Sequence, residues 1–110
     1  MKPSIVLIGA GHWGSKILSR LHATGVLHTV VVQNLDKYAS LVSRYPGLRW
    51  TTCLDEIWHN PEITGVIVAT PANTHAPLVE AALQACKHVF CEKPLAMDLA
   101  TARPLTDLAR

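Results

Sequence analysis

The sequence has no segment that predicts a membrane span, a secretion signal or a nucleic-acid surface. No stretch approaches the roughly 18 consecutive apolar residues of a membrane-spanning helix. The apolar run after Met1-Lys2-Pro3-Ser4 is interrupted by Gly9, so it is too short for the hydrophobic region of a signal peptide. Lys and Arg alternate with Asp and Glu, form no run, and leave a net charge of +2. We therefore expect neither membrane nor nucleic-acid partners.

Cysteine and aromatic residues are also scarce. Cys53, Cys86 and Cys91 are an odd number of cysteines without the spacing of a metal site, and the histidines lack such spacing too. We expect reduced thiols, a cytoplasmic protein and no bound metal. Aromatic residues make up only 5% of the chain, and Ala, Val and Leu supply most of its 49% hydrophobic content. This composition is typical of helices packed on a buried parallel sheet, and 110 residues suffice for one domain with a core.

Strand-like and helix-like segments alternate along the whole chain. Short apolar or β-branched runs predict strands, at residues 4–8, 29–32, 49–52, 65–69 and 88–91. Helical spacing of apolar residues predicts helices, at residues 13–23, 36–45, 55–58, 74–86 and 98–110. Short connections between these elements favour an α/β fold, a doubly wound parallel sheet of the Rossmann type with strand order 3-2-1-4-5, formed by one domain at residues 1–110.

Single residues predict how some of the helices begin, end or bend. Gly25 is placed to end the first helix in a left-handed conformation. Asp55 is expected to cap the short helix that runs through Trp58, and Thr74 to cap the helix after the fourth strand. Pro104 is expected to kink the last helix, because proline removes a backbone donor and clashes with the preceding turn.

A glycine loop follows the first predicted strand. Gly9, Gly11 and Gly14 have the G-x-G-x-x-G spacing between a strand and a helix, the context in which this motif binds a dinucleotide. The first glycine permits a tight turn, the second lets the pyrophosphate approach the backbone, and the third lets helix and strand pack closely. His12 and Trp13 lie inside the loop and could cover the cofactor. A tight turn without a ligand is the alternative.

The end of the second strand bears on the choice of cofactor. An acidic side chain about 20 residues beyond the glycine loop pairs with the ribose hydroxyls of NAD. Here Asn34 occupies that place, and Asp36 and Lys37 follow it. Asn34 tolerates a 2′-phosphate, and Lys37 could attract one, but Asp36 can substitute for the missing acid and no arginine is nearby. We expect NAD or NADP, with NAD slightly favoured, and Asn34 as a mere turn residue remains the alternative.

Polar residues also follow the fourth and fifth strands. Thr70, Asn73 and His75 offer hydroxyl, amide and imidazole groups toward the expected cleft, although a simple capping loop would look the same. Glu92-Lys93-Pro94 follows the fifth strand, at the edge where open parallel sheets bind ligands. Lys93 is the expected catalytic residue, donating to a substrate oxygen or sharing its proton, with Glu92 contacting the cofactor ribose or tuning the lysine. The alternative is a solvated surface pair.

Taken together, three segments resemble the N-terminal domain of the Gfo/Idh/MocA oxidoreductases: Gly9-Ala10-Gly11-His12-Trp13-Gly14, Ala69-Thr70-Pro71-Ala72-Asn73-Thr74-His75 and Cys91-Glu92-Lys93-Pro94. The resemblance implies NAD(P)-dependent hydride transfer to or from a sugar, cyclitol or similar carbinol. It implies that Lys93 binds substrate and assists proton transfer. It also implies cofactor contacts from the glycine loop and from Asn34, Thr70, Pro71, Asn73, His75 and Glu92.

The sequence departs from this family pattern in three ways. Asn34 replaces the usual acidic residue, and Cys86 stands where the family often has glycine. Family members continue into a sixth strand and a C-terminal α/β domain that supplies much of the substrate pocket and usually the oligomer interface. We expect that domain to be absent here, the 110-residue chain alone to be inactive, and self-association to be possible. A non-catalytic nucleotide-binding or interaction module is the alternative function, and a different Rossmann enzyme such as a methyltransferase is a third.

Overall fold

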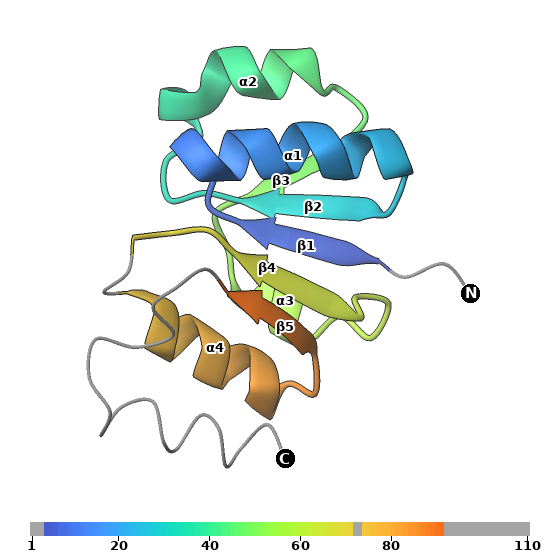
Figure 1. Cartoon of the computed structure of the whole chain (residues 1–110), viewed down its shortest axis with the longest axis vertical. Coiled ribbons are helices and arrows are strands. Elements are labelled where there is room, and N and C mark those ends of the chain that lie inside the picture. The colour runs from blue at the N-terminus through green and yellow to red at the C-terminus, as the bar shows by residue number, and fades with distance from the viewer. Residues whose placement is uncertain (1–3, 72–73, 92–110) are drawn as a thin grey trace.

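The part of the chain that the structure describes forms one five-stranded, fully parallel sheet with helices on both faces (Figure 1). The computed structural model describes residues 4–71 and 74–91, with the backbone alone at His12 and Trp13. The strands lie in the order β3-β2-β1-β4-β5, which confirms the predicted doubly wound Rossmann topology. Their bounds are β1 (Ile5–Ile8), β2 (Leu27–Val31), β3 (Arg49–Thr51), β4 (Gly65–Val68) and β5 (His88–Cys91).

The helices follow the strands in the expected alternation. They are α1 (His12–Thr24), the 3₁₀ helix η1 (Asp36–Tyr38), α2 (Ala39–Arg44), α3 (Asp55–Trp58) and α4 (His75–Gln84). The predicted helix at 98–110, with its kink at Pro104, lies outside the described residues. Gly25 ends α1 with φ +76°, and its N–H donates to the carbonyl of His22, as predicted for a left-handed helix end.

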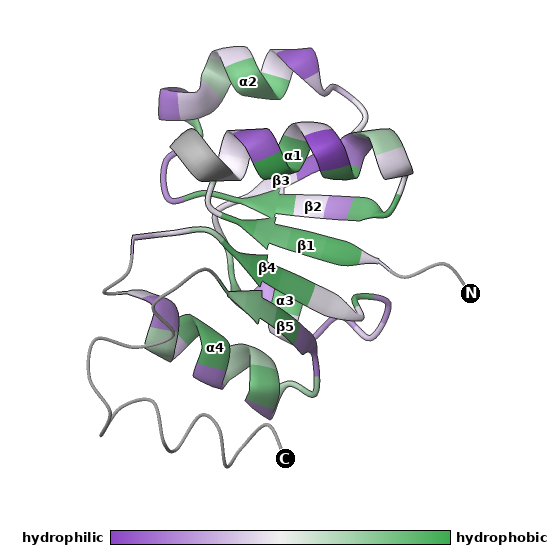
Figure 2. Cartoon of the chain, in the orientation of Figure 1, coloured by the Kyte–Doolittle hydropathy of each residue, from purple (hydrophilic) through white to green (hydrophobic). Residues whose placement is uncertain are grey.

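Each face of the sheet has its own hydrophobic cluster. Leu7, Val30 and Leu18 pack together on the α1 side, and none of the three is exposed. On the other side, Val6 and Val68 pack against Val79 of α4. Alternate residues of one strand therefore enter opposite clusters, which is why the central strand β1 is hydrophobic along its whole length (Figure 2).

Three local predictions were wrong. The helix predicted at 36–45 is split into η1 and α2, and none of its residues is buried, so packing does not enforce one continuous helix. Asp55 does not cap α3, because Leu54 is already helical (φ −68°, ψ −32°) and Asp55 falls inside the first turn, where its charge still favours the helix dipole. Thr74 occupies the N-cap position of α4, but its hydroxyl makes no capping bond to the helix.

Candidate functional site

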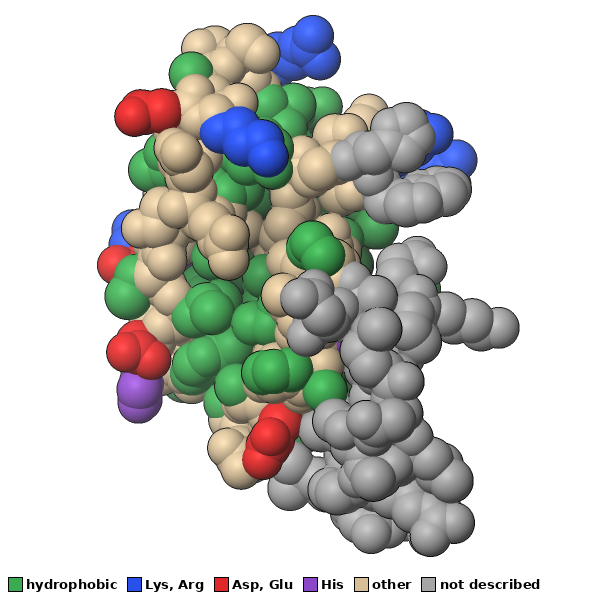
Figure 3. All heavy atoms as spheres, turned by 90° about the vertical axis from the view of Figure 1, so that its left-hand side faces the viewer, with side chains coloured by type: hydrophobic (Ala, Val, Ile, Leu, Met, Phe, Trp, Pro, Cys, Tyr) green, Lys and Arg blue, Asp and Glu red, His purple; other side chains and the backbone are tan. Residues whose placement is uncertain are grey.

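The carboxyl ends of all five strands lie along one edge of the sheet. The segments that follow β1, β2 and β4 leave the sheet there, on the left of Figure 1. Seen face on in Figure 3, this edge carries hydrophobic side chains gathered in its lower half. The Lys and Arg side chains visible in this view lie in the upper half, on the side of α1 and α2. In open parallel sheets the ligand binds at this edge, at the point where the strand order reverses, which here lies between β1 and β4.

Two glycines of the loop after β1 are required by the packing of the chain itself. Gly9 has φ +99°, and a Cβ on it would lie 2.7 Å from the carbonyl oxygen of Ala69. A Cβ on Gly14 would lie 2.3 Å from the carbonyl oxygen of Gly9. Both distances are too short for any real side chain. The first turn of α1 is therefore held against the end of β1, and the glycine loop against the end of β4.

Gly11 differs from these two glycines. A Cβ built on it would have no atom within 4 Å, and its backbone (φ −71°, ψ −154°) suits any residue. Nothing in the described chain requires glycine here. Gly11 is also the N-cap of α1, so the first-turn amides at residues 12–14 lack acceptors inside the helix and form the positive end of its dipole. An open backbone beside these amides fits a pyrophosphate.

The loop after β4 is held by a chain of short hydrogen bonds. The Thr74 hydroxyl donates to the carbonyl of Pro71 at 2.6 Å, and the Thr70 and Thr74 hydroxyl oxygens lie 2.6 Å apart. Because the Thr74 proton is committed to Pro71, Thr70 is the donor in this second bond. The sequence identified Thr70 as a candidate but missed this role of Thr74, since a threonine before a helix is typical of an ordinary cap.

His75 belongs to the same network. Only 2% of its surface is exposed, and its Nε2 lies 2.8 Å from the carbonyl oxygen of Thr70. A carbonyl only accepts hydrogen bonds, so Nε2 carries a proton. The structure thus places His75 beneath the loop, where it fixes the end of β4 rather than facing solvent.

Asn34 lies in the turn that links β2 to η1. Its Oδ1 accepts the backbone N–H groups of Asp36 at 3.0 Å and Lys37 at 3.4 Å. All three residues are exposed. Asn34 thus forms the turn that the alternative interpretation expected. Because its Oδ1 faces the turn, its side-chain N–H₂ group points away from it.

Several predicted site residues fall outside the described part of the chain. Asn73, Glu92 and Lys93 are among them, as is the Pro94 that follows, and the side chains of His12 and Trp13 are not described either. Cys91 is half-buried and packs against the cluster on the α4 side, as expected of a core cysteine. Within the described residues, no group of His, Cys, Asp or Glu side chains could hold a metal ion.

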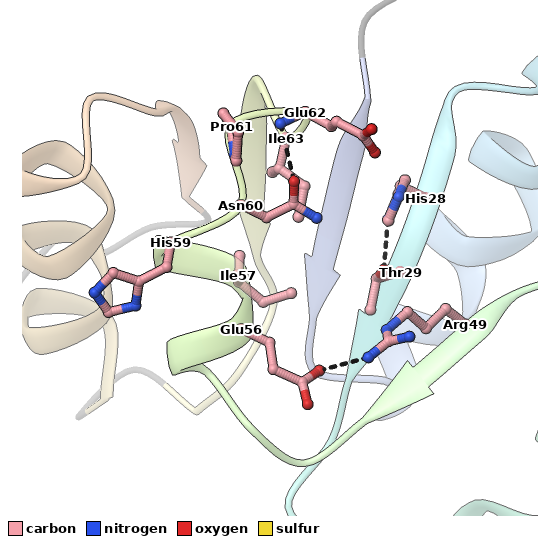
Figure 4. Close-up of a pocket in the computed structure, with 10 residues that line it drawn as sticks. All are labelled: His28, Thr29, Arg49, Glu56, Ile57, His59, Asn60, Pro61, Glu62 and Ile63. Atoms are coloured by element: carbon pink, nitrogen blue, oxygen red, sulfur yellow. Dashed lines mark hydrogen bonds and ion pairs between the residues drawn. The ribbon is translucent and has the colours of Figure 1, made fainter.

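A separate pocket of about 580 Å³ lies in the amino-terminal half of the sheet (Figure 4). It is bounded by the starts of β2 and β3, by α3 and by the segment before β4. Arg49 donates to Glu56 at 2.9 Å, and this hydrogen bond lowers the pKa of the exposed Glu56 carboxyl. The pocket is remote from the strand ends that bind ligands in this fold class, so we assign the site to the carboxyl edge instead.

Comparison with known proteins agrees with the geometry of the carboxyl edge. Residues 4–110 match the Gfo/Idh/MocA family, described as an oxidoreductase family with an NAD-binding Rossmann fold. The chain belongs to this family. Of the helices described here, none is long and apolar enough to cross a membrane.

Individual relatives are dehydrogenases and reductases. Inositol 2-dehydrogenase 2 of Paenarthrobacter aurescens is 35% identical over 94 residues, which is 84% of this chain and 28% of the relative. GenD2 from gentamicin A biosynthesis, solved with NAD, is 32% identical with a TM-score of 0.87, covering 98% of this chain and 31% of GenD2. KijD10, a 3-ketoreductase from Actinomadura kijaniata solved with NADP and TDP-benzene, is 26% identical with a TM-score of 0.85, covering 100% of this chain and 34% of KijD10.

The match is to only part of each relative. An uncharacterized oxidoreductase of Streptococcus pneumoniae is 30% identical over 104 residues, yet these are 28% of its length. The chain thus corresponds to the NAD-binding Rossmann portion of much longer oxidoreductases.

Proposed function

We propose that residues 1–110 are the dinucleotide-binding domain of an oxidoreductase that transfers hydride between a nicotinamide cofactor and a carbinol substrate. The class of substrate rests on the relatives, which include an inositol 2-dehydrogenase and a 3-ketoreductase solved with TDP-benzene. When bound, the cofactor would accept or deliver the hydride. The chain's own contribution is to hold its pyrophosphate at the start of α1 and its two ribose halves along the carboxyl edge.

The observation that carries this proposal is the contrast among the three loop glycines. Gly9 and Gly14 are explained by contacts inside the chain, whereas Gly11 faces open space. A ligand that approaches the backbone closely explains why a side chain is missing at Gly11 as well. The first-turn amides of α1 lie next to this space and supply the donors that a pyrophosphate needs.

The remaining roles follow from position along the same edge. Thr70, Pro71 and Asn73 would form the wall of the cleft beyond β4, and His75 would support it from below through the carbonyl of Thr70. Glu92 and Lys93 come directly after β5, the strand next to β4. We propose that the Lys93 amine donates to the substrate oxygen and shares its proton during the reaction, with the substrate held by a further domain of the kind that the longer relatives possess.

Titration of the 110-residue chain with NADH and NADPH tests the binding step. We expect saturable binding of at least one reduced cofactor, followed by its fluorescence. Gly11→Ala should weaken binding about tenfold or more, because the new methyl group occupies the space left for the pyrophosphate. Gly47→Ala is the matched control, since Gly47 also has open space around it but lies in the turn before β3. Absence of binding by either cofactor at millimolar concentration would refute the proposal.

A further inference from the structure

The segment after β2 offers hydrogen-bond donors where an NAD-specific site offers a carboxylate. Val32, the residue that continues β2, is apolar, 4% exposed and clustered with Ala10 of the glycine loop. Gln33 and Asn34 follow as exposed amides. The place of the acid in NAD sites, about 20 residues beyond the glycine loop, thus holds the neutral amide of Asn34 instead of a carboxylate.

The orientation of the Asn34 amide is fixed by chemistry. The backbone N–H groups of Asp36 and Lys37 are donors, so the side-chain atom that faces them must be the oxygen. The amide nitrogen therefore faces away from the turn with two N–H donors. An aspartate at the same place would present its second carboxylate oxygen, a hydrogen-bond acceptor, to the ligand. Asparagine presents N–H donors there instead.

A cation lies on the same turn. The Lys37 Nζ is 5.6 Å from the centroid of the Tyr38 ring, within reach of a cation–π contact that restrains it near the turn. Asp36 is the one acidic residue between Val32 and Tyr38, and the adjacent lysine offsets its charge. More widely, the Lys and Arg side chains on this face of the molecule lie on its α1 and α2 side (Figure 3).

We propose that the Asn34 amide and the Lys37 amine bind the 2′-phosphate of the adenosine ribose, so that the chain prefers NADP(H) over NAD(H). A phosphate near neutral pH presents acceptor oxygens, which match an outward N–H₂ group and an ammonium group. This inference rests on the proposed cofactor site and reverses the slight preference for NAD that Asp36 suggested from the sequence. The reversal follows from the Asn34 oxygen, which already accepts the N–H groups of Asp36 and Lys37 and so leaves only N–H donors for the ligand.

The preference is measured by titrating the 110-residue chain with NADPH and NADH under the same conditions. We expect NADPH to bind at least about tenfold more tightly than NADH, because one charge-assisted hydrogen bond typically changes an affinity by about that factor or more. Adenosine 2′,5′-bisphosphate and 5′-AMP, followed by NMR, test the adenosine half alone and should show the same order. If both dinucleotides bind and NADH binds equally well or better, this inference is wrong while the proposed function stands. If neither binds, the proposed function itself fails.

Asn34→Asp is the sharpest variant. A carboxylate still accepts the N–H groups of Asp36 and Lys37, so the turn should persist, but it places a negative charge at the proposed phosphate contact. We expect NADPH affinity to fall about tenfold or more while NADH affinity holds or rises. Lys37→Gln should also weaken NADPH alone.

Asn60→Asp is the matched control for that variant. Asn60 forms the same kind of turn, with its Oδ1 accepting the N–H of Glu62 at 2.9 Å, but it lines the pocket in the amino-terminal half of the sheet. The same charge change there should leave the ratio of the two affinities unaltered. Equal effects of the two Asp variants, or an unchanged ratio in Asn34→Asp with both cofactors still binding, would overturn the inference.

Discussion

The two ends of the parallel sheet use the same local devices for different purposes. At the carboxyl edge, Asn34 closes a turn through Oδ1, and at the amino end Asn60 does the same. Yet the first turn adjoins a glycine loop with open backbone, whereas the second joins a pocket in which Arg49 and Glu56 already satisfy each other. Local geometry alone therefore does not mark a binding site. The position of the turn relative to the carboxyl ends of the strands marks the site. Substitutions at the carboxyl edge should therefore alter cofactor binding, and substitutions at the amino end should alter stability alone.

The largest effect on stability is expected within the glycine loop. Gly9→Ala combines a left-handed backbone with a Cβ 2.7 Å from the Ala69 carbonyl oxygen, and should cost about 3 kcal/mol of unfolding free energy. Gly11→Ala should change it by less than about 0.5 kcal/mol, because its Cβ meets nothing. Urea denaturation measures both. Similar losses for the two variants would break the distinction between the packing glycine and the ligand glycine.

At the amino end, Lys87 offers a second test. It is only 8% exposed, and its Nζ donates to the backbone carbonyl of Asn60 at 2.7 Å. Lys87→Met keeps the apolar stem but removes the donor, so we expect a loss of about 1–2 kcal/mol in urea denaturation. Arg20→Met, on the exposed side of α1, is the control. Cofactor affinity of the folded Lys87 variant should match that of the native chain, and a marked loss would argue against separate ends.

A gain in stability is expected where α4 ends. Cys86 has φ +61°, a conformation that costs a non-glycine residue about 1–2 kcal/mol. Glycine avoids this cost, but it also raises the conformational entropy of the unfolded chain, which offsets part of the gain. Cys86→Gly should therefore stabilise the chain by about 0.5–1 kcal/mol. Cys53→Gly, at an exposed cysteine without positive φ, should not stabilise it. Thermal melts of both variants decide between these outcomes.

The smallest effect is expected at the ion pair of the amino-end pocket. Arg49 lowers the folded-state pKa of Glu56, so the pair stabilises the protein above the ordinary pKa of glutamate and this contribution disappears as pH falls through the lowered value. Both side chains are well exposed, at 61% and 43%, so the contribution is small. Glu56→Gln should lower the melting temperature slightly at neutral pH and not at all in acid. A larger deficit in acid would contradict this sign.

The sequence was sufficient to predict the fold, because the strands are short apolar or β-branched runs that alternate with helical patterns and are bounded by turn signals. The strand order and the bounds of α3 and β5 were correct. The split between η1 and α2 was not foreseen, since periodicity shows that Leu41 faces the core but not that no residue of the segment is fully buried.

For the candidate site, too, the sequence pattern predicted some features and only the three-dimensional structure showed others. The glycine spacing predicted which loop to examine, but not that Gly11 is the one of its three glycines around which a Cβ would meet no atom. Likewise, His75 was recognisable as a candidate, while its burial and its bond to Thr70 depend on how the loop after β4 folds back. The roles of Glu92 and Lys93 stay predictions.

An NMR titration of the ¹⁵N-labelled chain with NADPH tests the central claim most directly, because it reports on both ends of the sheet at once. We predict saturable shifts for the amides of Gly9–Gly14, of Gln33–Lys37, of Thr70 and of Thr74, which lie at the carboxyl edge. The amides of Arg49, Asn60, Glu62 and Ile63, which border the other pocket, should remain unshifted. Saturable shifts centred on that pocket, with the glycine loop unaffected, would contradict the account.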